Sequence, residues 1–157
     1  MGTETQPEWS DSTDRTIEAI LHIQPIMHRK MHREVFFAAL RQLGLGIGFH
    51  HIIIMATLKN FGRATSSEIG ETTYISKAQM THSTGKLILM GLIKGHPDPK
   101  DKRKTNFILT VEGHRVLDHM HEITVSLIKE RLSTLPPDQV ETLGRSLEKA
   151  AGIFMKL

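Results

Sequence analysis

The chain of 157 residues contains no cysteine, one tryptophan and one tyrosine. Without cysteine it cannot form a disulfide, a cysteine-based zinc finger, a catalytic thiol or a thiol redox switch. No apolar run approaches the roughly 20 residues that a membrane-spanning helix needs. The first residues also lack the charged and then apolar pattern of a signal peptide. We therefore expect a cytoplasmic protein without a membrane segment.

Sequence patterns for catalysis are also missing. The zinc-protease motif H-E-x-x-H, the hydrolase motif G-x-S-x-G and the phosphate-binding P-loop do not occur. The stretch Gly44-Leu45-Gly46-Ile47-Gly48 is reminiscent of a dinucleotide-binding loop, but it follows a predicted helix instead of a strand. Phe49 also stands where the third glycine of that motif should fall. We interpret the stretch as a flexible connector, and we predict neither an enzyme nor a cofactor.

Positive charge is concentrated in one part of the chain. The formal net charge is +3, whereas residues 77–104 contain seven Lys or Arg against two Asp, a local charge of +5. The rest of the chain therefore sums to −2. Such a concentration suits a polyphosphate partner such as a nucleic acid.

The same region carries two helix-start signals of the form S/T-x-x-E/Q, at Thr65 to Glu68 and at Ser76 to Gln79. In this pattern the hydroxyl accepts the N–H three residues on, and the Glu or Gln reaches back to the first residue. Gly91 follows where the second helix should end, and residues 93–109 read as strand, charged tip and strand. Helix, turn, helix and hairpin in this order indicate a winged helix-turn-helix, whose chemistry is DNA binding.

We predict a mostly α (α+β) fold, in which a winged helix-turn-helix core with a two-stranded β-wing is flanked by helices. A short helix is expected to end at Pro25, where a longer one begins, and a buried helix is expected over residues 49–60. The terminal helices carry more apolar surface than a small core requires, so we expect them to join two copies as a homodimer. The predicted parts are a disordered tail (1–13), N-terminal dimerisation helices (14–45), the winged helix-turn-helix (46–112) and C-terminal dimerisation helices (113–157).

The predicted recognition helix, residues 77–90, has two distinct faces, as helical periodicity requires. The residues expected to pack inward are Met80, Thr84, Leu87 and Ile88. Small and polar residues on the opposite face could enter a major groove without a steric clash. These are Ala78, Gln79, His82, Gly85 and Lys86.

Motifs around the hairpin resemble those of the MarR family of winged-helix regulators. That family typically shows Gly-Leu-Ile/Val, then D-x-x-D-x-R at the wing tip, and then Leu-Thr-x-x-Gly. The matching segments here are Gly91-Leu92-Ile93, Asp98-Pro99-Lys100-Asp101-Lys102-Arg103 and Leu109-Thr110-Val111-Glu112-Gly113. Two positions depart from the family pattern. Gly95 replaces a common arginine at the wing base, and Gly70 replaces a common alanine, which puts the rigidity of the wing in question.

The resemblance implies a homodimer that binds a palindromic operator, usually represses transcription, and is released by a small, often aromatic, anionic effector. It implies that Arg103 enters the minor groove, where a narrow groove attracts a guanidinium, and that Asp101 orients it. Lys100, Lys102 and Lys104 would contact phosphates. The other residues expected at the DNA are Thr65, Ser66, Ser76, Lys77, Gln79, Thr81, His82 and Lys86. No residue can be assigned to an effector pocket from the sequence.

Two alternatives to this reading stay open. The chain has ten histidines, and a metal-responsive regulator of the same fold could use a cluster of them, although imidazole ligands need convergent neighbours. The candidate ligands are His28, His32, His51, His114 and His121. The second alternative is a winged helix that docks onto an acidic protein. The predicted DNA-facing surface, however, lacks the large apolar anchors that protein interfaces favour.

Overall fold

The computed structural model describes residues 11–99 and 101–156, and the chain divides into two compact units, Met1–Ala38 and Ala39–Leu157. Of the predicted tail, residues 1–10 lie outside the described part, and so does Lys100 in the wing. Among the described residues, no helix has the length and apolar character needed to cross a membrane. The domain boundaries inferred from the sequence remain predictions.

The first unit is helical from Asp11 onward. It contains α1 (Asp11–Met27), the π-helix η1 (His28–Phe36) and the start of α2 (Phe37–Leu43). The predicted tail is thus wrong for residues 11–13, where acidic side chains in the first turn favour a helix start. The predicted break at Pro25 is also wrong, because α1 continues through it and the wider turns of η1 begin three residues later. Proline lacks the backbone N–H and so removes one hydrogen-bond donor, and a helix can continue without that single bond.

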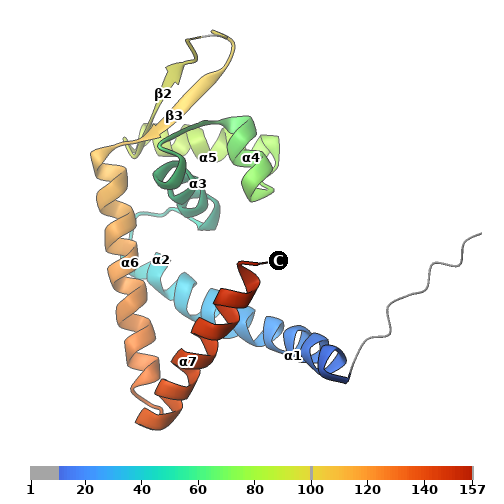
Figure 1. The fold of residues 1–157 in the computed structure, drawn as a ribbon. Coiled ribbons are helices and arrows are strands. Elements are labelled where there is room, and N and C mark those ends of the chain that lie inside the picture. Colours follow the sequence, from blue (N-terminus) through green and yellow to red (C-terminus); the bar gives the residue numbers. More distant parts are fainter. Residues whose placement is uncertain (1–10, 100, 157) are drawn as a thin grey trace, which may run out of the picture. The chain divides into compact units, whose positions relative to one another are not determined.

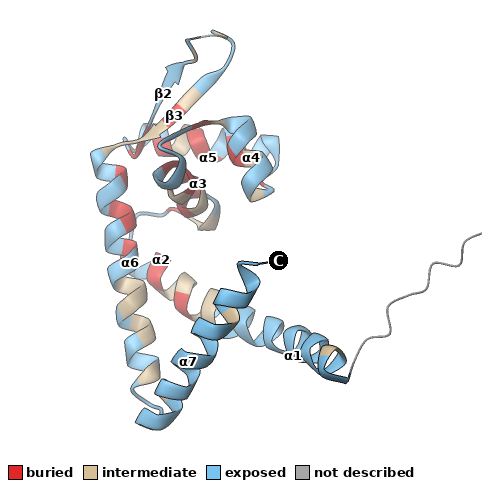
Figure 2. Cartoon of the chain, in the orientation of Figure 1, coloured by how far each residue is buried: buried red, intermediate tan, exposed pale blue. Residues whose placement is uncertain are grey.

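The second unit is built around α3 (Phe49–Phe61), which packs against α4, α5, α6 and two strands. Ile54, Met55 and Leu58 are almost fully buried, and Figure 2 shows buried residues along this helix. This confirms the predicted buried helix at the centre of the domain. Burial of each such side chain contributes about 1.5–3 kcal/mol relative to exposure, so α3 supplies much of the apolar stabilisation.

The helix-turn-helix consists of α4 (Ser66–Thr73) and α5 (Lys77–Leu89). The predicted capping box of α4 is complete, because Thr65 Oγ1 accepts from the Glu68 N–H at 3.3 Å and Glu68 Oε2 accepts from the Thr65 N–H at 2.7 Å. The box predicted for α5 is half formed. Ser76 Oγ accepts from the Gln79 N–H at 3.3 Å, but the Gln79 amide donates to Ser83 Oγ at 2.9 Å. The turn between the two helices spans residues 74–76, since α4 extends to Thr73 and α5 begins at Lys77.

The wing belongs to a three-stranded antiparallel sheet in the order β1-β3-β2, made of β1 (Arg63–Thr65), β2 (Ile93–Pro97) and β3 (Thr105–Leu109). Phe107 on the central strand pairs with Ala64 on one side and Gly95 on the other. Figure 1 shows the β2–β3 hairpin projecting beyond the helix-turn-helix. The two predicted wing strands are confirmed, whereas the three-residue β1 was missed.

Helix α6 (Val111–Leu132) begins at the foot of the wing, and α7 (Pro137–Phe154) follows it. The Thr110 hydroxyl accepts from the Gly113 N–H at 3.0 Å and lies within hydrogen-bonding distance, as a donor, of the Gly91 carbonyl (2.8 Å) and the Leu92 carbonyl (3.0 Å). The Thr110 N–H donates to Leu92 as well, at 3.1 Å. The Leu-Thr-x-x-Gly motif therefore joins the first turn of α6 to the start of β2.

Gly70 lies inside α4, where an alanine would fit. A Cβ at this position would have its nearest contact with the Ile75 carbonyl at 3.5 Å, an ordinary van der Waals distance. Because glycine costs a helix interior about 0.5–1 kcal/mol relative to alanine, we expect Gly70→Ala to raise the free energy of unfolding by about that amount. Urea denaturation of both proteins would check this, and a lower midpoint for the variant would contradict it.

Candidate nucleic-acid interface

The inner face of α5 fixes which side of the recognition helix meets solvent. Met80, Thr84 and Leu87 are buried as predicted, but Ile88 is 44% exposed, so its predicted inward position is wrong. Ser83 takes the remaining buried place and is fully covered. Its hydroxyl is satisfied by the Gln79 amide, which makes a buried polar residue tolerable there.

The outer face of α5 exposes some of the residues that were predicted to contact DNA. Ser76, Lys77, Thr81 and His82 are exposed, as a surface that meets DNA requires. Two predicted contacts are instead engaged within the protein. Gln79 bonds Ser83, and the Lys86 ammonium donates to the Gly46 carbonyl at 2.5 Å, forty positions earlier in the chain. The glycine stretch interpreted as a flexible connector is therefore attached to α5.

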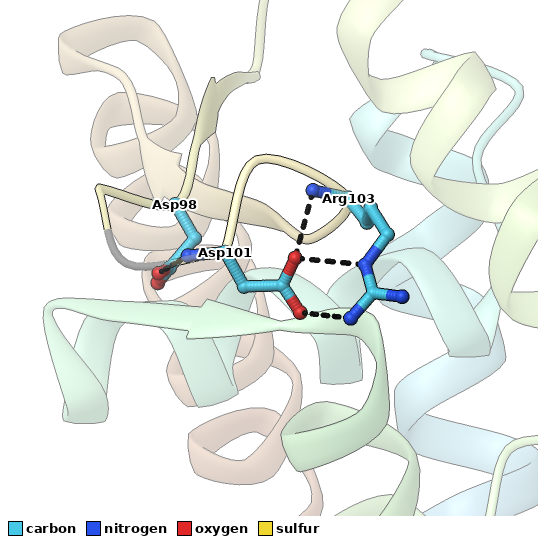
Figure 3. Close-up of polar contacts among 3 residues, drawn as sticks. All are labelled: Asp98, Asp101 and Arg103. Carbon is cyan, nitrogen blue, oxygen red and sulfur yellow. Dashed lines mark hydrogen bonds and ion pairs between the residues drawn. The ribbon is translucent and has the colours of Figure 1, made fainter.

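At the wing tip, the carboxylate of Asp101 binds the guanidinium of Arg103 through both of its oxygens (Figure 3). Asp101 Oδ1 accepts from Arg103 Nε at 3.1 Å, and Asp101 Oδ2 accepts from Nη2 at 3.3 Å. The Arg103 backbone N–H also donates to Oδ1, at 3.1 Å. These bonds, the side-chain bond first, lower the pKa of Asp101 and so favour its ionised form. The Arg103 side chain is still 91% exposed, and its orientation is set before any ligand arrives.

A second carboxylate closes the loop beneath this pair. Asp98 accepts from the Asp101 N–H at 3.0 Å and from the Asn106 amide at 2.6 Å, which ties the tip to β3. Backbone bonds from Asp98 to the Lys104 carbonyl (2.9 Å) and from Lys104 to the Asp101 carbonyl (2.8 Å) complete the turn. The D-x-x-D-x-R pattern thus has a structural reason, because its first acid shapes the loop and its second aims the arginine.

Gly95 at the wing base is enclosed by its neighbours on β3. A Cβ there would come within 2.9 Å of Thr105 Cγ2 and 3.4 Å of the Phe107 ring. Phe107 fills the space that a larger residue at position 95 would need. The wing base is therefore held by packing and by the β2–β3 ladder.

A hollow of about 330 Å³ lies where the start of α4, the outer side of α5 and the wing meet. It brings five predicted site residues together, and hydroxyl groups and two cations dominate its lining. The lining residues are Thr65, Ser66, Ser67, Thr81, Thr84, Arg103, Lys104, Thr105 and Phe107. The other four lining residues, Ser67, Thr84, Thr105 and Phe107, were not predicted as site residues, because neither a capping role nor a charge marks their side chains. Hydroxyl and cationic donors around one hollow can bind a phosphate or another anion.

The candidate metal ligands do not gather. Across residues 11–99 and 101–156, no three His, Asp or Glu side chains are placed to hold a metal ion. His28 and His32 stack with their ring centres 5.1 Å apart in the first unit. His114 and His121 both interact electrostatically with Asp118. The carboxylate of Asp118 accepts a hydrogen bond from the Lys59 ammonium at 2.7 Å. That bond, above all, lowers the pKa of Asp118.

Comparison with known proteins agrees with this geometry. The model of the MarR family matches residues 45–104, from the glycine stretch to the wing tip. An uncharacterized HTH-type transcriptional regulator of Bacillus subtilis, YkoM, is 30% identical over 97 residues, which span 62% of this chain and 63% of that protein.

Two solved structures show the same fold. Wild-type MarR from E. coli in its apo form superimposes with a TM-score of 0.70 at 21% identity, over 94% of this chain and 98% of that one. A mutant MarR from E. coli complexed with operator DNA gives a TM-score of 0.59 at 22% identity, over 90% and 99% of the two chains. Sequence motifs and the family model over residues 45–104 thus support a likeness to the MarR family, and the solved structures show that the chain has the same winged helix-turn-helix fold.

Proposed function

We propose that the chain is a sequence-specific, DNA-binding transcriptional regulator that acts as a dimeric repressor. The observation that carries the proposal is the wing tip, where Asp101 aims the exposed Arg103 beside a hydroxyl-rich and cationic hollow. A guanidinium that is oriented in advance suits a narrow minor groove, whose negative potential attracts it. The exposed side of α5 would lie in the adjacent major groove. The likeness to a structure complexed with operator DNA supports this arrangement.

The dimer is supported by apolar side chains that each unit leaves uncovered. In α1, Ile17, Ile20 and Leu21 are 42–58% exposed, and in α7, Ile153 and Phe154 are 63% and 55% exposed. No residue of either helix is buried. Exposed apolar surface on this scale marks an interaction site. A second copy of the chain would cover it and give the twofold symmetry that a palindromic operator mirrors.

Release by a small anionic effector completes the proposal. The hollow supports it, since an anion seated there would engage Arg103 and Lys104, the groups that duplex binding also needs. An anion at this place and a DNA phosphate would therefore compete.

The function is tested by binding of the full chain to random duplexes at two salt concentrations, followed by selection of bound sequences. Phosphate contacts predict a steep loss of affinity with salt, and base contacts predict an enriched, palindromic sequence. Sedimentation at the same concentrations would report the dimer. Failure to bind duplexes in dilute buffer would refute DNA binding, and a monomer would refute the dimeric arrangement.

Two substitutions should separate sequence readout from phosphate contact. Lys102→Ala is expected to weaken binding to all duplexes alike and to reduce the salt slope by about one, since Lys102 is an exposed cation at the wing. Thr81→Ala, on the exposed outer face of α5, is expected to change the order of preference among duplexes. Lys149→Ala on α7 is a matched control that should leave both unchanged. A uniform loss in the first two variants would show that this division of roles is wrong.

A further inference from the structure

The glycine stretch before α3 is tied at two points. The Lys86 ammonium on α5 donates to the Gly46 carbonyl at 2.5 Å, and the Gly48 N–H donates to His51 Nδ1 at 3.0 Å. Gly44 and Gly46 have φ values of +69° and +62°, a backbone conformation that residues other than glycine rarely adopt. The stretch is therefore attached both to the first turn of α3 and to the recognition helix.

His51 can hold this stretch only as a neutral ring. Its Nδ1 accepts a backbone N–H, so its single proton lies on Nε2. The residue is only 8% exposed, and Nε2 is buried with no hydrogen-bond partner among the described residues. A second proton would have to sit on Nδ1, where it would face the Gly48 N–H and abolish the bond.

The surroundings of His51 also oppose a positive charge. The ionisable groups that interact electrostatically with His51 are Lys86 and His82 from α5 and His50 from α3, and all three are basic. Burial first, and then the charge of Lys86, lowers the pKa of His51. A histidine of this kind stabilises the fold fully at neutral pH and above. The stabilisation is lost as the pH falls below the ordinary histidine value of about 6.5 toward the lower folded value.

We propose that protonation of His51 detaches the glycine stretch from α5 and thereby weakens duplex binding, so that acidification releases the protein from DNA. The charged ring has to leave its buried position, and the Gly48 N–H then loses its hydrogen-bond acceptor. Repulsion between the two positive charges moves the Lys86 ammonium away from the Gly46 carbonyl. Helix α5 then loses the hydrogen bond that attaches it to the glycine stretch. This inference rests on the proposed DNA-binding function. It has the opposite sign to the effect of positive charge added on an exposed surface, which favours DNA.

The variant that isolates this effect is His51→Gln. Residue 51 is the third residue of α3, the position at which Gln normally reaches back to the N-cap N–H, so glutamine can keep the bond without titrating. Duplex affinity is measured for the wild type, His51→Gln and His82→Gln at about pH 7.5 and about pH 5.5, at fixed ionic strength. The affinity of the wild type relative to His51→Gln should fall on acidification, by at most about tenfold per pH unit for one proton. His82→Gln should show at least the full wild-type loss.

Hydrogen exchange of the peptide that covers residues 44–51 provides a readout without DNA. At about pH 5.5 the wild type should exchange faster than His51→Gln, after normalisation to the loop at residues 133–136. If His51→Gln does not fold, the normalised exchange of the wild type at the two pH values serves instead. Equal exchange in both comparisons, or equal pH dependence of affinity in the two proteins, would overturn the proposal. If no duplex binds at either pH, the DNA-binding function fails, and the exchange result alone decides whether His51 releases the stretch.

Discussion

Replacing Arg103 with alanine is expected to weaken duplex binding by about 1–3 kcal/mol, the range for a specific contact of a positioned side chain. The guanidinium is exposed and held by Asp101, so the wild type loses little side-chain freedom when it binds. Fluorescence anisotropy titration with a selected duplex would measure the loss. The free energy of unfolding should change little, because the side chain is 91% exposed.

A second variant tests whether geometry or only charge is required. Arg103→Lys keeps the charge but loses the planar fork that Asp101 grips, and we expect it to recover only part of the affinity. Full recovery would show that a point charge is enough at the wing tip. Unchanged affinity in Arg103→Ala would remove the wing from the binding mechanism altogether.

Gly113→Ala is expected to lower the free energy of unfolding by about 3 kcal/mol or more, at or beyond the upper end of overpacking effects. A Cβ at this position would lie 2.2 Å from the Leu92 carbonyl oxygen and 2.7 Å from Leu109 Cδ1. The carbonyl cannot move aside at little cost, because it also accepts from the Thr110 N–H. The backbone at the base of the wing would have to shift.

Chemical denaturation, with Gly85→Ala as the control, measures this effect. Position 85 lies in α5, where an added Cβ meets nothing within 4 Å, so the same methyl group should be neutral or slightly stabilising there. Similar midpoints for the two variants would contradict the steric argument.

Features carried by short-range chemistry could be predicted from the sequence. The capping box at Thr65 and Glu68 and the cap at Ser76 depend on residues three apart, and both helices begin where these signals placed them. The hairpin followed from two apolar strands around a charged tip. The contact between Asp101 and Arg103 was also expected, from the family motif, and its two residues are only two positions apart in the chain.

Features that depend on distant partners could not be predicted. Strand β1 has three residues, too few for a periodic pattern, and its partner β3 lies about forty residues later. Lys86 was assigned to DNA because nothing in its local sequence indicates Gly46 as a partner. Ile88 was placed inside by its apolar character, whereas the fully buried Ser83 takes an inward position on α5.

The hydroxyl of Thr110 lies at the start of α6 and also contacts the backbone just before β2. Because one side chain serves both elements, the long helix and the hairpin form a single mechanical body at this point. A tilt of α6, whatever its origin, must therefore be passed to the distal end of the hairpin, where a small rotation at the base becomes a larger displacement of Arg103.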